Sequence, residues 1–150
     1  MDILISEKEV TDVINLSKNK DKLASKEFRA LDVKNSQDYR KIMERKQINL
    51  IYNLEYDSHN DFIYQRNSGF NQVLAKIAKA NNITIGFSFQ DFKESKQKYK
   101  ILGRLYQNYK LCKKYNLNVL VKSFAKKKED LQSEIILKAF ERILIKRKLY

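Results

Sequence analysis

Short apolar runs alternate along the chain with longer segments in which apolar residues recur at helical spacing. The runs predict five strands, at residues 2–6 (DILIS), 28–33 (FRALDV), 48–55 (INLIYNLE), 83–89 (ITIGFSF) and 117–124 (LNVLVKSF). Helices are predicted between them, because apolar residues there return every third or fourth position. Strands that alternate with helices favour a parallel sheet, so the pattern predicts an α/β fold.

Each predicted unit of one strand and one helix takes about 30 residues, so five of them fill the 150-residue chain. A closed barrel of eight such units typically needs about 250 residues and does not fit. The chain has no proline and no Gly/Ser-rich linker. We therefore expect a single domain over residues 1–150.

Apolar residues at helical spacing indicate three of the predicted helices. The first is indicated by Val10, Val13, Ile14 and Leu16, and the second, at about 36–46, by Tyr39, Ile42 and Met43. The last, at about 129–147, is expected to bury Leu131, Ile135, Ile136, Phe140 and either Ile143 or Leu144. Such stripes predict helices that pack on one side of the sheet.

The stretch 66–89, RNSGFNQVLAKIAKANNITIGFSF, combines a polar loop, a helix and a strand. The helix has one continuous apolar stripe, formed by Phe70, Val73, Leu74, Ile77 and Ala78. Asn67 or Ser68 is expected to cap it, with Gly69 supplying backbone freedom.

A further helix is predicted at about residues 95–115. Leu102, Leu105, Tyr109 and Cys112 share one of its faces, whereas Lys96, Lys100 and Arg104 form a row at i, i+4 spacing on another. We expect the first face to be buried and the basic row to be exposed.

Basic residues are concentrated in the C-terminal part of the chain. The net charge is +13, but residues 1–92 contain 14 Lys and Arg against 13 Asp and Glu, while residues 93–150 contain 17 against 5. A composition rich in Lys, Asn and Ile also suits an AT-rich genome, yet such a bias would raise the Lys content of residues 1–92 as well. The asymmetry therefore favours contact with RNA or DNA.

The single cysteine, Cys112, has no partner for an internal disulfide, which fits a reducing compartment. No apolar run approaches the roughly 20 residues of a membrane span, and residues 1–10 lack the pattern of a signal peptide. We expect a cytoplasmic protein that has no membrane partner.

Few residues could carry chemistry of their own. Asp57, His59 and Asp61 could contact a cation at alternate positions, but a polar turn uses the same residue types. Cys112 is expected to be a packed thiol, and the three glycines are too isolated to cradle a phosphate. The sequence therefore predicts no catalytic residues and no bound metal or cofactor.

Two polar residues stand out as contact candidates. Arg66 is expected at the carboxyl end of the sheet, where ligands of parallel sheets usually bind, although a surface ion pair with Asp57 or Asp61 explains it equally well. Asn108, between Tyr106 and Tyr109, could bind a partner or cap a loop.

The stretch 66–89, followed by GRLYQNYKLCKKYNLNVLVKSFA, closely resembles the ribonuclease P protein component 3 family over about residues 48–150. The resemblance implies a TIM-like barrel, here α/β and truncated, with about five mostly parallel strands and shortened at the N-terminus. Asn118-Val119 stands where the family usually has Val-Pro, and LQSEII replaces its usual Arg-Ser-Pro. These departures bear on the local loops.

The resemblance implies a noncatalytic subunit of ribonuclease P, the ribonucleoprotein that removes the 5′ leader from precursor tRNA. In that family the RNA performs the hydrolysis with Mg²⁺, and the protein pairs with component 2. The expected partners are ribonuclease P RNA, precursor tRNA through the complex, and component 2. The expected RNA contacts are Arg66, Lys96, Lys100, Arg104, Lys113, Lys114 and Lys122, and Asn108 is the expected partner contact.

Two other functions remain open: a small metal-dependent phosphoesterase on a related barrel, and a general RNA-binding assembly protein. A single histidine speaks against the first. Five parallel strands cannot close a barrel and leave two unpaired edges. Association through the sheet, as a homodimer or with component 2, is therefore also expected.

Overall fold

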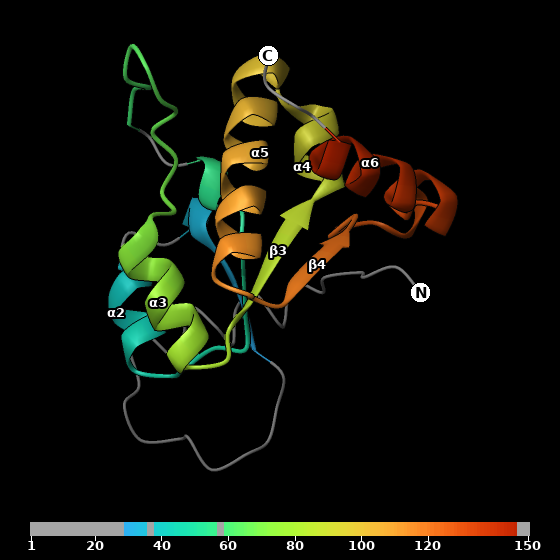
Figure 1. Ribbon diagram of the computed structural model, residues 1–150. Coiled ribbons are helices and arrows are strands. Elements are labelled where there is room, and N and C mark those ends of the chain that lie inside the picture. Colours follow the sequence, from blue (N-terminus) through green and yellow to red (C-terminus); the bar gives the residue numbers. More distant parts are fainter. Residues whose placement is uncertain (1–28, 36–37, 57–58, 147–150) are drawn as a thin grey trace.

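The computed structural model describes residues 29–35, 38–56 and 59–146 (Figure 1). Its strands are β1 (Ala30–Asp32), β2 (Leu50–Tyr52), β3 (Thr84–Ser88) and β4 (Val119–Lys122). Its α-helices are α2 (Tyr39–Glu44), α3 (Gln72–Ala80), α4 (Phe89–Glu94), α5 (Lys98–Lys114) and α6 (Glu134–Lys146). The predicted strand at 2–6 and the predicted helix marked by Val10 to Leu16 lie outside the described residues.

The four described strands form one parallel sheet in the order β1-β2-β3-β4. Neighbours in the sheet are also neighbours along the chain, with Ile51 beside Ile85 and Gly86 beside Leu120. Sequential parallel strands with helical connections are the arrangement found in βα barrels. The predicted α/β class with parallel strands is confirmed, and four of the five predicted strands form, each shorter than its apolar run.

One face of the sheet carries the main hydrophobic core. Ile51, Ile85 and Phe87 project from it into a cluster that also contains buried residues of α2, α3, α5 and α6. Those four helices therefore cover the same face, and Figure 1 shows α5 lying along it. Cys112 is part of this core, and burial raises the pKa of its thiol to about 12. The prediction of a packed cysteine is confirmed.

The alternate residues of the strands form a second, smaller cluster on the other face of the sheet. Leu50, Tyr52 and Phe124 are buried there, and the rings of Tyr52 and Phe124 stack at 4.5 Å. A Cβ atom at Gly86 would lie 2.8 Å from the Phe124 ring and 2.9 Å from Cβ of Tyr52. Only glycine therefore lets these rings meet over β3.

Three helices end in the same way before the next strand. Lys46, Asn82 and Asn116 follow α2, α3 and α5 with φ values of 55°, 53° and 50°. In each case the next N–H donates to the carbonyl five residues earlier, as from Ile83 to Ala78 (2.8 Å). This is the Schellman arrangement, in which asparagine tolerates the left-handed conformation that glycine usually takes. A chain with three glycines thus makes repeated sharp turns into its strands.

Several helix details differ from the prediction. Asn71 caps α3 by accepting from the Leu74 N–H at 3.0 Å, and neither Asn67 nor Ser68 does so. Gly69 does not have a positive φ, so it supplies no unusual backbone conformation. In the stripe itself Val73 is exposed and Ala75 is buried instead, so the buried face of α3 is formed by Leu74, Ala75 and Ala78.

The predicted helix at about 95–115 is confirmed as α5, and the short helix α4 that precedes it was not predicted from the sequence. In α6 the buried residues are Leu137, Phe140 and Leu144, whereas Ile135, Ile136 and Ile143 are exposed. Leu131, which was expected to be buried in this helix, lies before it and is also exposed. Apolar residues lie on more than one face of α6, so their spacing alone could not show which face is buried. None of the helices that the structure describes has the length and apolar character of a membrane span.

Candidate nucleic-acid interface

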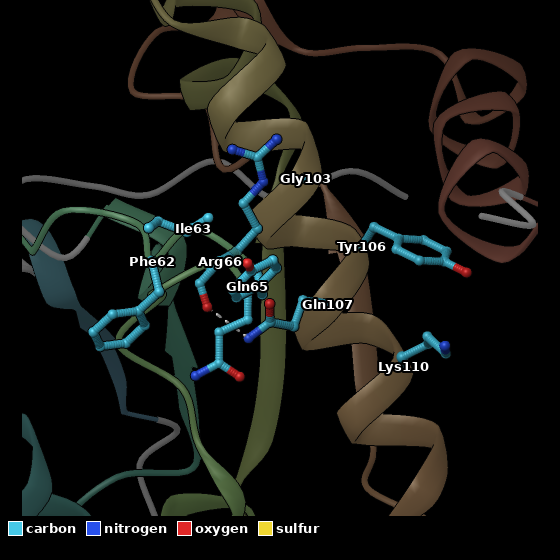
Figure 2. A pocket seen from close by; sticks show the side chains of 9 residues that line it. Phe62, Ile63, Gln65, Arg66, Gly103, Tyr106, Gln107 and Lys110 are labelled. Atoms are coloured by element: carbon cyan, nitrogen blue, oxygen red, sulfur yellow. Dashed lines mark hydrogen bonds between the residues drawn. The ribbon is translucent and has the colours of Figure 1, made fainter. Parts of the chain in front are cut away.

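Two adjoining hollows lie between α5 and the loop of residues 59–68, and together we call them the α5 groove. Their volumes are about 480 and 430 Å³, and both are lined by Gln65, Arg66, Gln107 and Lys110. Phe62, Ile63, Tyr64 and Tyr106 also line the first hollow, and Lys114 lines the second. Figure 2 shows the loop and the helix on the two sides of the first hollow.

Arg104 attaches this loop to the core. Its guanidinium is buried, with 1% of the residue exposed, and it donates to the carbonyls of Glu55 (2.9 Å) and His59. Its Nε also donates to the Asp61 carboxylate at 2.8 Å. A guanidinium has several donors in one plane, so Arg104 can satisfy three acceptors of an irregular segment at once.

Asp61 is the second fixed point of the loop. It accepts from Arg104, from Nη1 of Arg66 (3.0 Å) and from the N–H of Asn67 (2.8 Å). Burial acts to raise the pKa of Asp61, but the hydrogen bonds from Asn67, Arg104 and Arg66 outweigh it and lower the pKa to about 2. The carboxylate is therefore charged at neutral pH, and two arginines share its charge.

Arg66 lies at the rim of the groove, against α5. The alternative explanation from the sequence, an ion pair with Asp61, is confirmed, but 43% of the Arg66 side chain remains exposed. Its carbonyl accepts from Nε2 of Gln107 at 3.0 Å, the contact drawn as a dashed line in Figure 2. Both ends of the residue are thus held while part of its guanidinium faces solvent.

Gly103 lets Arg66 lie close to the helix. A Cβ atom at Gly103 would be 2.8 Å from Nε of Arg66. We expect Gly103→Ala to displace the Arg66 side chain and to weaken several-fold the RNA binding that the sequence predicts. The unfolding free energy should stay equal or rise by up to about 1 kcal/mol, because alanine favours a helix over glycine.

Urea unfolding and RNA titration of the Gly103→Ala variant measure the two effects separately. Ala139→Gly, at an exposed position of α6, is the matched control: it should lose stability and leave RNA binding unchanged. RNA affinity equal to the wild type in Gly103→Ala would contradict this role for Arg66.

Of the seven predicted RNA contacts, Arg66 and Lys114 line the α5 groove. Lys113 is exposed on the same helix, with Nζ 5.3 Å from the centre of the Tyr109 ring. Lys96 is exposed in the turn before α5, while Lys100 and Lys122 are half-buried in α5 and at the end of β4. These five remain predictions as RNA contacts.

Two of the predicted contact residues, Arg104 and Asn108, are buried and do not lie at the surface. Arg104 faces the core instead of continuing the row of Lys96 and Lys100, because the loop of residues 59–68 covers its position on α5. Asn108 is fully buried and accepts from the hydroxyl of Ser68 at 2.5 Å. Neither side chain can reach an RNA or a partner protein in this structure, and both instead hold the loop.

Lys110, Gln107 and the exposed residues of the loop were not predicted from the sequence. Lys110 lies four residues from both Tyr106 and Lys114, and its Nζ is 5.8 Å from the centre of the Tyr106 ring. That i, i+4 spacing could have revealed one basic and aromatic row on α5. No local pattern places residues 62–65 beside this row.

A separate group of polar residues lies at the carboxyl ends of the strands. Asn53, after β2, donates to Asp32 at 2.9 Å and to Asp91 at 3.1 Å. Asp91 also accepts from Ser88 at 2.6 Å and from the ammonium of Lys34. Burial acts to raise the pKa of Asp91, but these hydrogen bonds and the charge of Lys34 lower it. The charge of Asp91 is therefore balanced within this group by Lys34, whereas burial raises the pKa of Asp32.

Glu55 lies beside this group and differs from it. Only 1% of Glu55 is exposed, and neither carboxylate oxygen has a hydrogen-bond partner among the described residues. Burial, and to a lesser degree the charge of Asp91, raises the pKa of this carboxyl to about 8. Glu55 is thus mostly protonated and neutral at pH 7.

The possible cation site at Asp57, His59 and Asp61 has no support in the part of the chain that is described. Asp57 itself lies outside the described residues, and Asp61 is engaged by two arginines. Among the described residues, no three His, Cys, Asp or Glu side chains are grouped so that they could hold a metal ion.

Two curated proteins are similar to this chain, and both are named ribonuclease P protein component 3. The one from Methanosarcina acetivorans is 34% identical over 83 residues, which is 54% of this chain and 35% of that protein. The one from Methanosarcina mazei is 31% identical over 93 residues, which is 61% of this chain and 39% of that protein. The resemblance indicated by the sequence is confirmed. The match spans little more than a third of the length of these relatives.

A solved structure shows the same fold. It is a cryo-EM structure of archaeal ribonuclease P with mature tRNA, and it contains a chain that superposes with a TM-score of 0.69 at 20% identity. The superposition covers 94% of this chain and 57% of that chain. No protein-family model matches the sequence.

Proposed function

We propose that this protein is a noncatalytic subunit of ribonuclease P that binds the catalytic RNA and supports removal of the 5′ leader from precursor tRNA. The observation that carries the proposal is the similarity to two ribonuclease P protein component 3 sequences. The shared fold with a chain of archaeal ribonuclease P supports it.

The charge distribution supports an RNA partner. Residues 93–150 hold 17 Lys and Arg against 5 Asp and Glu, and α5, within this region, forms one wall of the groove. A concentration of positive charge attracts the phosphate backbone regardless of base sequence. Arg66, Lys110 and Lys114 are the groove cations that we expect to meet phosphates.

The proposed role of the chain is to bind and position RNA. Arg104 and Asp61 hold the loop of residues 59–68, and the loop and α5 present the cations. Hydrolysis in this proposal belongs to the RNA with its Mg²⁺ ions. Component 2, a second copy of the chain and a cytoplasmic location remain predictions of the same proposal.

Reconstitution tests this function. The protein alone should leave precursor tRNA intact, whereas its addition to ribonuclease P RNA and the other protein subunits should raise the rate of 5′ leader removal. Arg66→Gln with Lys110→Gln and Lys114→Gln should reduce that stimulation, and Lys126→Gln, an exposed lysine outside the groove, should not.

Two results would contradict the proposed function. One is Mg²⁺-dependent cleavage by homogeneous protein free of RNA, which would indicate an enzyme in its own right. The other is an unchanged rate when the protein is omitted from the reconstituted complex, together with native protein that co-purifies with RNAs other than ribonuclease P RNA.

A further inference from the structure

We propose that the α5 groove binds unpaired nucleotides of RNA, whose bases stack on the aromatic side chains of the loop while their phosphates meet the cations of α5. This inference rests on the proposed function and adds to it the form of RNA that the site takes. It assigns the loop of residues 59–68 a role in recognition.

The loop presents its large side chains to solvent. Phe62 is 60% exposed, Ile63 92% and Tyr64 97%, although large apolar side chains are usually buried in a core. Three such residues in succession form an exposed apolar patch, and patches of this kind mark binding sites. All three line the first hollow of the groove.

The base of the loop is fixed, although its side chains are exposed. The N–H of Phe62 donates to the carbonyl of Gln65 at 3.0 Å, which closes a tight turn. Asp61 and Asn67 are joined across the loop at 2.8 Å, and Arg104 attaches Asp61 to the core. A ligand that binds to a backbone already held in place loses less entropy on binding.

The charges of the groove select the kind of ligand. Arg66, Lys110 and Lys114 line it, and none of the described residues that line the two hollows is acidic. Asp61, which precedes Phe62 in the same loop, is paired with Arg66 and Arg104. Aromatic side chains next to cations suit a polyanion with flat apolar faces, which describes RNA.

Unpaired nucleotides fit this surface better than a duplex does. A base in a duplex is stacked on its neighbours and shows only its edges, so an aromatic side chain cannot reach its face. A protruding loop with Phe62 and Tyr64 can stack on a base only if that base is free. The cations of α5 can then follow the backbone of the same strand.

Fluorescence anisotropy with two labelled RNAs tests the inference. One probe is a 12-nucleotide oligouridine, and the other is a blunt RNA duplex of the same length. We expect the wild-type protein to prefer the single strand. Tyr64→Ala and Phe62→Ala should each weaken single-strand binding by about 5- to 150-fold, as for loss of a stacked base, with little change for the duplex.

Matched variants separate stacking from charge and from folding. Tyr64→Phe retains a ring and should bind as the wild type does. Tyr99→Ala removes a tyrosine that is 73% exposed outside the groove and should have no effect. Lys110→Gln with Lys114→Gln should instead lower the log–log salt slope for the single strand by about 1.4, at roughly 0.7 for each phosphate contact.

Each outcome decides the inference. If the wild type binds RNA and neither Tyr64→Ala nor Phe62→Ala changes that binding, the inference is overturned while the proposed function stands. Loop variants that bind RNA normally but no longer join the reconstituted complex would overturn the inference as well, because the loop would then bind a protein. Failure of the wild type to bind either probe would also overturn it, and the reconstitution assay decides separately whether the proposed function survives.

Discussion

Replacing Arg104 with methionine is expected to lower the free energy of unfolding by about 3 kcal/mol or more, because a hydrogen bond from a charged donor contributes about 1.5–3 kcal/mol and Arg104 makes three of them. The substitution retains a long side chain but removes the donor of the Glu55 and His59 carbonyls. Asp61 loses one of its donors and keeps Arg66 and the N–H of Asn67. The loop of residues 59–68 should then detach from α5.

Urea unfolding, monitored by circular dichroism, measures this loss. Lys110→Met is the matched control, because it makes the same change at an exposed position of the same helix and should cost less than about 1 kcal/mol. If Arg104→Met does not fold, Asp61→Asn provides the test, since it weakens the same contacts without removing the guanidinium. A loss below about 1 kcal/mol in both variants would show that Arg104 does not hold the loop.

The stability of the protein is expected to fall as the pH rises from about 5 to about 8. Glu55 has a pKa of about 8 in the folded protein, against an ordinary value of 4.5. Between these values the unfolded chain releases the proton while the folded protein keeps it, so rising pH favours unfolding. Each unit of pKa shift corresponds to about 1.4 kcal/mol, so the total effect is on the order of 4 kcal/mol.

Glu55→Gln tests the origin of this pH dependence. Glutamine has the shape of the neutral acid but does not titrate, so the unfolding free energy of the variant should depend on pH much less over the same range and exceed that of the wild type at pH 8. The remaining dependence comes from Asp32, because burial also raises the pKa of that carboxyl. Asp61 and Asp91 do not interfere, because their pKa values are lowered and they titrate below this range. Equal slopes for wild type and variant in urea unfolding at pH 5 to 8 would exclude Glu55 as the cause.

The strands were predictable because they are apolar over several consecutive residues. Ile51, Ile85 and Phe87 face the helices, and Leu50, Tyr52 and Phe124 form the opposite cluster, so both faces of the sheet are apolar. A strand buried on both sides reads as an uninterrupted apolar run. The helix α6 was harder, since Ile135, Ile136 and Ile143 match the buried residues in character but face solvent.

The candidate site was only partly predictable. Arg66 and Lys114 were identified from the sequence, and they line the same groove. Arg104 and Asn108 were misread, because their polar side chains are buried by contacts with residues about 40 positions away. Helical periodicity places Arg104 in a row with Lys100, but it carries no information on which segment packs over that row.

Residue types in local order are enough to predict the alternation of strands and helices, the basic C-terminal region and the resemblance to ribonuclease P protein component 3. Which cations face solvent depends instead on how distant segments pack together. The 59–68 loop folds back on α5, buries Arg104 with Asp61, and places Tyr64 in the same hollow as Lys110. Such burial results from packing between distant segments, and the free energy of those contacts has no local signature in the chain.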